Sequence, residues 1–144
     1  MSIAAQPGYG PSLSLSNARR AADAAVAAAS ELGVPSVVAV VDTGGHLIFL
    51  ERLDGTQFGS IRVAEAKARS AVAFKRPTKV FEDSLEHTPR ILALTEAMPV
   101  DGGFPLVVDG QIVGGIGAAG ATPQEDAEVA QAGVNALMMT AGKD

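Results

Sequence analysis

The dipeptide Asp109-Gly110 lies between two runs of mostly apolar residues, and this pattern constrains the fold more than any other in the chain. Asp and Gly readily adopt the positive backbone angles of a type I′ turn, which joins two antiparallel strands through two residues. The sequence therefore predicts a hairpin whose strands span residues 104–108 and 111–118. A fold that contains such a hairpin has an antiparallel sheet.

A second hairpin is predicted nearer the N-terminus. Residues 36–42 are rich in valine, residues 46–53 are again mostly apolar, and Thr43-Gly44-Gly45 separates the two runs. Runs of β-branched residues bounded by turn residues are typical of paired strands. The first of these strands has apolar side chains at successive positions, so both of its faces are expected to be buried.

Helical spacing and end signals predict helices elsewhere. Alanines recur at helical spacing ahead of Gly33, a residue that commonly ends a helix. Thr122 and Glu125 form a capping box that starts the last helix. Helices on either side of hairpins predict an α+β fold in which the helices pack across an antiparallel sheet. The predicted helices span residues 14–32, 60–74, 78–86, 88–97 and the chain from Thr122 onward.

The chain length predicts one domain. It has 144 residues and a mass of 14.6 kDa, which is the usual size of a single core. Residues 1–12 are rich in Gly, Pro and Ser and are expected to form a flexible N-terminal arm, which leaves residues 13–144 as the domain. The absence of cysteine excludes a disulfide framework and a thiol nucleophile.

Charge and composition exclude several partners. A net charge of −5 without a run of basic residues argues against nucleic acid, and an aromatic content of 4% leaves few side chains to stack on bases. No apolar stretch reaches the roughly 18 residues of a membrane span. The N-terminal stretch lacks the positive charge and apolar block of a secretory signal, so the cytoplasm is the expected location.

Small residues predict unusually close packing. Gly114, Gly115 and Gly117 cost backbone entropy within the last predicted strand, so a helix, a bulge or a ligand is expected to approach closely there. The run from Gly115 to Gly120 also has the letters of a dinucleotide-binding motif. It lies in a hairpin strand and not in a strand-helix-strand unit, which argues against that interpretation.

Lys67 is the first candidate for chemistry. On the predicted helix at 60–74, Arg62, Glu65 and Arg69 share one side and are interpreted as a solvated face, whereas Lys67 lies on a partly apolar side. Its alkyl stem could run along the sheet edge while the amine reaches water. Alternatively, the ammonium lies in a semi-apolar pocket, where it could bind a carboxylate or act as a base.

The two histidines, His46 and His87, are the candidate metal ligands. Each is typical of a polar surface position next to a turn or a helix cap. Either could instead be an axial ligand to haem iron, because haem needs only one or two protein donors.

A further candidate lies ahead of the second hairpin. Gly102-Gly103 could offer backbone N–H groups to an anion, or could simply form a tight turn that leads into the strand. Glu96, just upstream, could serve as an acid or as a charge at the end of a helix.

Several segments, taken in order, resemble the GlcG/HbpS-like family of haem-degrading or haem-binding proteins, which includes the C-terminal domain of PduO-type proteins. The similarity extends over roughly residues 13–137. The segments that carry it are Leu13-Ser14-Leu15, Asp42-Thr43-Gly44-Gly45-His46-Leu47, Arg52-Leu53-Asp54-Gly55, Ala66-Lys67-Ala68, Arg76-Pro77-Thr78, and residues 102–106 and 109–117.

The resemblance implies a profilin-like three-layer α/β/α domain with a five-stranded antiparallel sheet. It also implies a homo-oligomer in which dimers assemble into larger rings. Some members of the family bind haem or iron, and others accompany the breakdown of small metabolites.

Two functions are therefore expected. The first is an oligomeric protein that binds haem or a small carboxylate-bearing metabolite through Arg52, Lys67, Thr43 and the amides of Gly102-Gly103. The alternative is a cofactor-independent catabolic enzyme of the isomerase or lyase type that acts on a small hydroxy or oxo acid. In that case Lys67 would be the base or charge clamp and Glu96 a partner acid.

Overall fold

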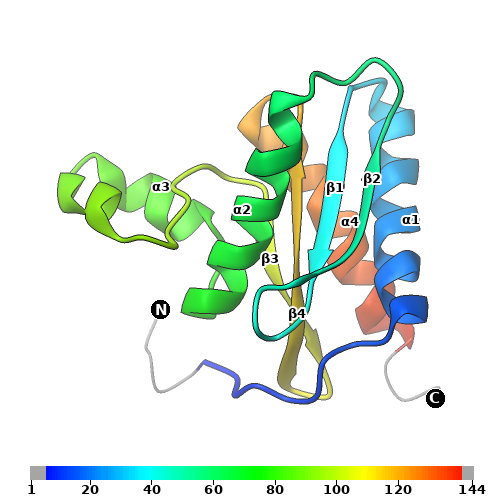
Figure 1. Ribbon diagram of the computed structural model, residues 1–144, viewed down its shortest axis with the longest axis horizontal. Coiled ribbons are helices and arrows are strands. Elements are labelled where there is room, and N and C mark those ends of the chain that lie inside the picture. Colours follow the sequence, from blue (N-terminus) through cyan, green and yellow to red (C-terminus); the bar gives the residue numbers. More distant parts are fainter. Residues whose placement is uncertain (1–5, 141–144) are drawn as a thin grey trace.

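The computed structural model describes residues 6–140, and the α+β expectation is confirmed (Figure 1). The helices and strands alternate in blocks along the chain. In order they are α1 (Leu15–Leu32), β1 (Val37–Val41), β2 (Leu47–Arg52), α2 (Gly59–Phe74), α3 (Lys79–Leu85), the 3₁₀ helix η2 (Pro89–Ala93), β3 (Gly103–Val108), β4 (Gln111–Ala119) and α4 (Pro123–Thr140).

The strands form an antiparallel sheet in the order β2-β1-β4-β3, so the two predicted hairpins lie side by side. Asp109 and Gly110 have φ angles of 51° and 76°, which are the two positive values that a type I′ turn requires. Every residue of β1 is buried, because β1 is a central strand with helices over both faces. Both hairpins and the burial of the first strand are thus confirmed.

The sheet has four strands within residues 6–140, and the expected fifth is not among them. The segment ahead of α1 comes nearest to a further strand: Gly10 N donates to Ile112 O, and Ile112 N donates to Gly8 O. Only Tyr9 and Ile112 form a bridge, in parallel orientation. The next hydrogen bond to β4 is donated by Leu13 N, to Val113 O, so the segment does not continue as a regular ladder.

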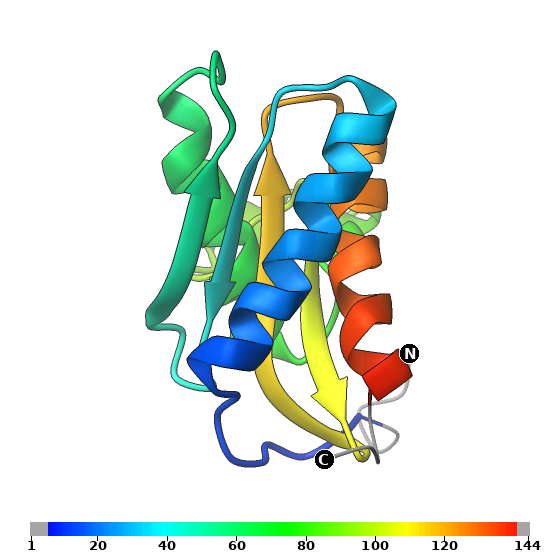
Figure 2. The same cartoon turned by 90° about the vertical axis from the view of Figure 1, so that its right-hand side faces the viewer.

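The helices cover the two faces of the sheet unequally. Helix α2 lies against one face, and α1 and α4 lie side by side on the other, so three layers result (Figures 1 and 2). The main core cluster is on the side of α1 and α4. Helix α3 and η2 project away from the sheet beyond α2. No helix within residues 6–140 combines the length and the apolar character that crossing a bilayer would take.

The close packing predicted from small residues is confirmed. A Cβ atom at Gly117 would meet the backbone O of Ala64 and the backbone N of Ala68, and one at Gly115 would meet Val72 and the backbone of Ala68. These glycines therefore allow the backbone of α2 to lie directly on β4. On the other face, the buried stripe of α1 consists of alanines: Ala18, Ala21, Ala22, Ala25 and Ala29.

Most predicted helix ends are also confirmed. Ser14 accepts a hydrogen bond from Asn17 N as the cap of α1, and Gly33 ends that helix with a left-handed φ of 69°. The predicted helix at 88–97 is wrong, since only Pro89–Ala93 is helical and the turn is of the 3₁₀ type. None of its residues is buried. A helix without a buried face gains no packing energy to extend it.

The N-terminal stretch contacts both the sheet and α2. Residues 1–5 of the expected arm lie outside the described residues. Beyond them, Leu13 N donates to Val113 O, and the hydroxyl of Tyr9 donates to Val72 O at 2.7 Å. The ammonium of Lys75 also lies 4.7 Å from the centre of the Tyr9 ring. These contacts bring the segment ahead of α1 to the C-terminal half of α2.

Candidate functional site

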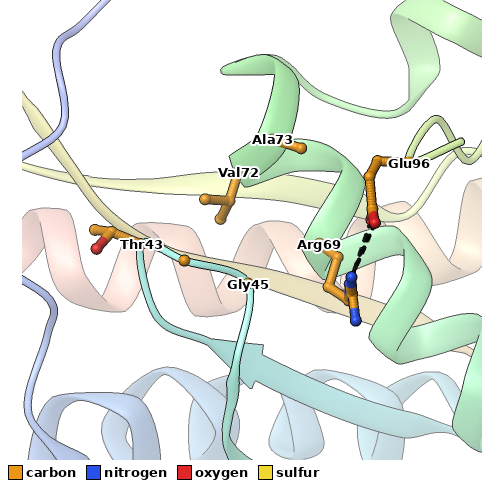
Figure 3. Close-up of a pocket in the computed structure, with 7 residues that line it drawn as sticks. Thr43, Gly45, Arg69, Val72, Ala73 and Glu96 are labelled. Atoms are coloured by element: carbon orange, nitrogen blue, oxygen red, sulfur yellow. Dashed lines mark hydrogen bonds and ion pairs between the residues drawn. The ribbon is translucent and has the colours of Figure 1, made fainter. Parts of the chain in front are cut away.

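A pocket of about 220 Å³ lies between the β1–β2 turn and the C-terminal half of α2 (Figure 3). One side is formed by the turn itself and the opposite side by α2, while Glu96 closes one end from the segment between η2 and β3. The residues that line it are Thr43, Gly44, Gly45, Arg69, Val72, Ala73 and Glu96. The lining combines a guanidinium and a carboxylate with a small apolar wall.

Arg69 and Glu96 form a two-pronged ion pair at this pocket. Arg69 Nη2 lies 2.9 Å from Glu96 Oε1, and Arg69 Nε lies 3.3 Å from Glu96 Oε2. Their side chains are 49% and 42% exposed, so both charges remain in contact with water. A planar guanidinium that binds a carboxylate through two donors is equally suited to a carboxylate from a ligand.

A second hollow of about 320 Å³ lies on the other side of this ion pair. Both Arg69 and Glu96 line it as well as the first, so the two hollows meet at this ion pair. The remaining residues that line it come from α2 and from the segment before β3: Arg62, Glu65, Ala66, Thr95, Ala97 and Met98.

The β1–β2 turn is held rigidly by Asp42. Its Oδ1 accepts hydrogen bonds from the backbone N of Gly44 at 2.8 Å and of His46 at 2.9 Å. Burial pushes the pKa of the Asp42 carboxyl up, but these two hydrogen bonds and the neighbouring imidazole outweigh it and hold that pKa below 3.8. Gly45 has a φ of 83°, which favours glycine, and a Cβ added there would lie 3.6 Å from Cγ of Arg69. The side of the pocket formed by the turn is therefore preformed.

Thr43 is fixed from the N-terminal side. Its hydroxyl lies 2.9 Å from the Ser12 hydroxyl, which also accepts a hydrogen bond from Thr43 N. On the opposite wall, the carbonyl O of Val72 accepts a hydrogen bond from the Tyr9 hydroxyl. The segment ahead of α1 thus braces both walls of the pocket, a role that the sequence did not indicate.

His46 lies next to the pocket, and its side chain is 83% exposed. The imidazole Nδ1 is 3.3 Å from Asp42 Oδ1, and the ring lies against Gly44, which lines the pocket. A carboxylate on one ring nitrogen orients an imidazole for coordination through the other. His87 follows α3 on the exposed side of the molecule and lines neither hollow.

Lys67 is buried elsewhere. Its side chain is 1% exposed, and its ammonium donates to Ala118 O at 2.9 Å and to Asp126 Oδ2 at 3.1 Å. The amine neither reaches water nor lines either of the two hollows described above. Its buried acceptors therefore give Lys67 a structural partner, so it and Glu96 do not form an acid–base pair.

Gly102 and Gly103 belong to the surroundings of Lys67. Gly102 N donates to Asp101 Oδ1 at 2.8 Å and Gly103 N donates to Thr78 Oγ1 at 3.0 Å, so both amides already have acceptors. A Cβ at Gly102 would lie 2.9 Å from Lys67 Nζ, and one at Gly103 would meet the Lys67 carbonyl. The two glycines thus make room for α2, as the turn interpretation expects.

The candidate residues consequently divide into groups. Thr43 and Glu96 line one pocket with His46 beside it, whereas Lys67 and the two glycines form a separate buried cluster. Arg52 lies at the far end of β2, paired with Val37 at the opposite end of β1 from the pocket.

Arg69 is the pocket residue that sequence reasoning missed. Its spacing from Arg62 and Glu65 indicated a solvated face, and it is indeed half-exposed. Its partner Glu96 is 27 residues away in the chain, so no local pattern could connect the two. Among residues 6–140, no three His, Asp or Glu side chains are grouped so as to hold a metal ion.

Comparison of the sequence with known proteins identifies the family of the chain. The family model "Haem degrading protein HbpS-like" matches residues 13–135. The chain is 36% identical to the protein GlcG of Escherichia coli K12 over 81 residues, which make up 56% of this chain and 60% of GlcG.

Solved structures show the same fold. HbpS of Streptomyces reticuli, solved as a double mutant, has a TM-score of 0.82 at 36% identity and covers 89% of this chain and 88% of its own. A structure of PduOC in complex with haem has a TM-score of 0.79 at 29% identity and covers 87% of this chain and 94% of its own.

Proposed function

Because the chain belongs to the HbpS-like family, we propose that it is a cytoplasmic, oligomeric protein that binds a small molecule carrying a carboxylate, either haem or a smaller metabolite. The observation that carries this proposal is the guanidinium of Arg69, which lines a preformed pocket together with Thr43 and the apolar Val72. A cation beside an apolar wall is the feature that fixes an acid with a short carbon skeleton.

The residues around the pocket fit haem in their chemistry. His46 has the carboxylate of Asp42 on Nδ1 and an exposed ring, so it is the imidazole that could ligate the iron. Arg69 could bind a propionate. When bound, haem would supply the iron chemistry. The 220 Å³ pocket is below the roughly 300–1,000 Å³ of pockets that enclose drug-sized ligands, so haem would extend beyond it.

The oligomer is proposed from the family assignment. Large apolar side chains are exposed at several places, with Phe58 80% exposed, Leu92 69% and Met138 60%. Any of them that lies in a contiguous apolar patch is a candidate for the contact between subunits.

Native mass spectrometry of protein purified without added ligand tests the proposal. We expect a multiple of the subunit mass together with a retained small molecule, or binding of haemin at one per subunit when it is added. Haemin titration should give a sharp Soret band that the His46→Ala variant weakens and the His87→Ala variant does not. A monomer that retains nothing and gives a featureless haemin spectrum would overturn the proposal.

A further inference from the structure

Glu96 occupies the guanidinium of Arg69, which is the group that a ligand carboxylate would bind. Glu96 binds the guanidinium through both of its oxygens, as an incoming carboxylate would. The pair also lines both the 220 Å³ pocket and the 320 Å³ hollow. The contact that occupies the cation therefore lies where the two hollows meet.

Separating Glu96 from Arg69 should cost little free energy. Its side chain is 42% exposed, so the carboxylate can turn into water without desolvation. It comes from the segment between η2 and β3, which the structure shows as bends and turns and not as a regular element. An exposed ion pair shifts an equilibrium by a factor of roughly five at most.

Arg69, in contrast, comes from a regular element. It extends from the C-terminal half of α2, and a Cβ added at Gly45 would lie 3.6 Å from its Cγ. The backbone that carries the cation is therefore fixed, whereas the segment that carries Glu96 is irregular. This asymmetry favours exchange of the carboxylate and not movement of the arginine.

We propose that Arg69 is the residue that binds the ligand carboxylate and that Glu96 is its internal competitor. A ligand carboxylate replaces Glu96 on Arg69, and the departure of Glu96 joins the two hollows into one elongated site. The inference rests on the proposed function and adds to it the residue that selects acids. It also explains how a pocket that is small in this structure can accept a larger acid.

Calorimetric titration with lactate and phenyllactate, each beside its uncharged amide, tests the exchange. In the Glu96→Gln protein, where no competitor offsets the loss, adding Arg69→Gln should weaken the binding of both acids by about twofold to fivefold, because it removes the exposed ion pair with the ligand. Glu96→Gln should strengthen binding of the acids by about twofold to fivefold, because it removes the competitor. The amides should show neither effect. Arg90→Gln, which removes an exposed cation of η2, is the matched control and should bind like the natural protein.

A spectroscopic readout shows the replacement itself. In NMR spectra, saturating lactate should move the Arg69 Nε–H resonance to the same position in the natural protein and in Glu96→Gln, because both then have the ligand as partner. Different final positions, or an unmoved resonance while the acid binds, would overturn the exchange.

The outcomes separate this inference from the proposed function. If Glu96→Gln binds the acids and adding Arg69→Gln leaves that binding unchanged, the inference fails and the proposed function stands. Failure of every acid to bind to both the natural protein and Glu96→Gln also overturns the inference. The proposed function is then still judged by the retained molecule and the haemin titration described above.

Discussion

The ammonium of Lys67 on α2 lies 3.1 Å from the carboxylate of Asp126 on α4, and the two side chains are only 1% and 4% exposed. These helices lie on opposite faces of the sheet, so the ion pair connects the two outer layers beside the start of β3. Ala121 N donates to the other carboxylate oxygen. Each of the two buried charges therefore has a second hydrogen-bond partner besides the other, Ala118 O for Lys67 and Ala121 N for Asp126.

Lys67→Met should destabilise the protein by about 3–5 kcal/mol, because it leaves the Asp126 carboxylate buried without its cation. The double variant with Asp126→Asn should recover much of this loss, since the amide can still accept from Ala121 N. Urea unfolding measures both. A single variant as stable as the natural protein would show that the pair is not needed.

The same Lys67→Met variant, at a temperature where it is folded, should retain ligand binding, because Lys67 lines neither hollow. Haemin or lactate titration checks this. Loss of binding by a folded Lys67→Met protein would show that Lys67 takes part in ligand binding and would contradict a purely structural role.

Gly117→Ala should destabilise the protein by about 1–3 kcal/mol or more, as overpacking of a tight core does. The added methyl group would meet the backbone of Ala64 and Ala68, which cannot move aside as a flexible side chain would. Gly59→Ala, at the open start of α2, is the control and should be neutral or slightly stabilising. Thermal unfolding distinguishes the two, and equal midpoints would contradict the close contact of α2 with β4.

The acid sensitivity of the fold should depend on Asp42. Its pKa is lower in the folded protein than the ordinary 3.8, so its stabilising effect is complete above about pH 5 and is lost as the pH falls through the folded value. Asp42→Asn should therefore lose less stability than the natural protein between pH 5 and pH 3. Urea unfolding at the two pH values measures the difference.

Asp101 should affect the pH dependence of stability in the direction opposite to Asp42. Burial raises the pKa of Asp101 and outweighs the hydrogen bond from Gly102 N, so this carboxyl costs stability as the pH rises through its folded value. Asp101→Asn should lose less stability than the natural protein as the pH rises. If both variants changed the pH dependence in the same direction, the assigned hydrogen-bond and burial effects would be wrong.

Local signals in the sequence predicted the fold well. The Ser14 cap, the Gly33 end and the Asp109-Gly110 turn each depend on a few neighbouring residues, and the structure confirms all three. The errors arose where burial decides the outcome. The segment after Thr88 has a helix start but no buried face, and the segment ahead of α1 forms only the Tyr9–Ile112 bridge with β4.

The candidate site was predicted less completely, because its contacts are distant in the chain. Thr43 and Glu96 were identified by residue type, and both line the pocket. The partner of Arg69 is 27 residues away and that of Lys67 is 59 residues away, so periodicity could not show that one cation is half-exposed and the other buried.

The most direct test is a crystal structure of the protein grown with its retained ligand or with added haemin. We predict density between Thr43 and Arg69, with a ligand carboxylate on the guanidinium and Glu96 turned away from it. A ligand bound elsewhere, with the Arg69–Glu96 pair intact, would contradict the central claim that this pocket is the binding site.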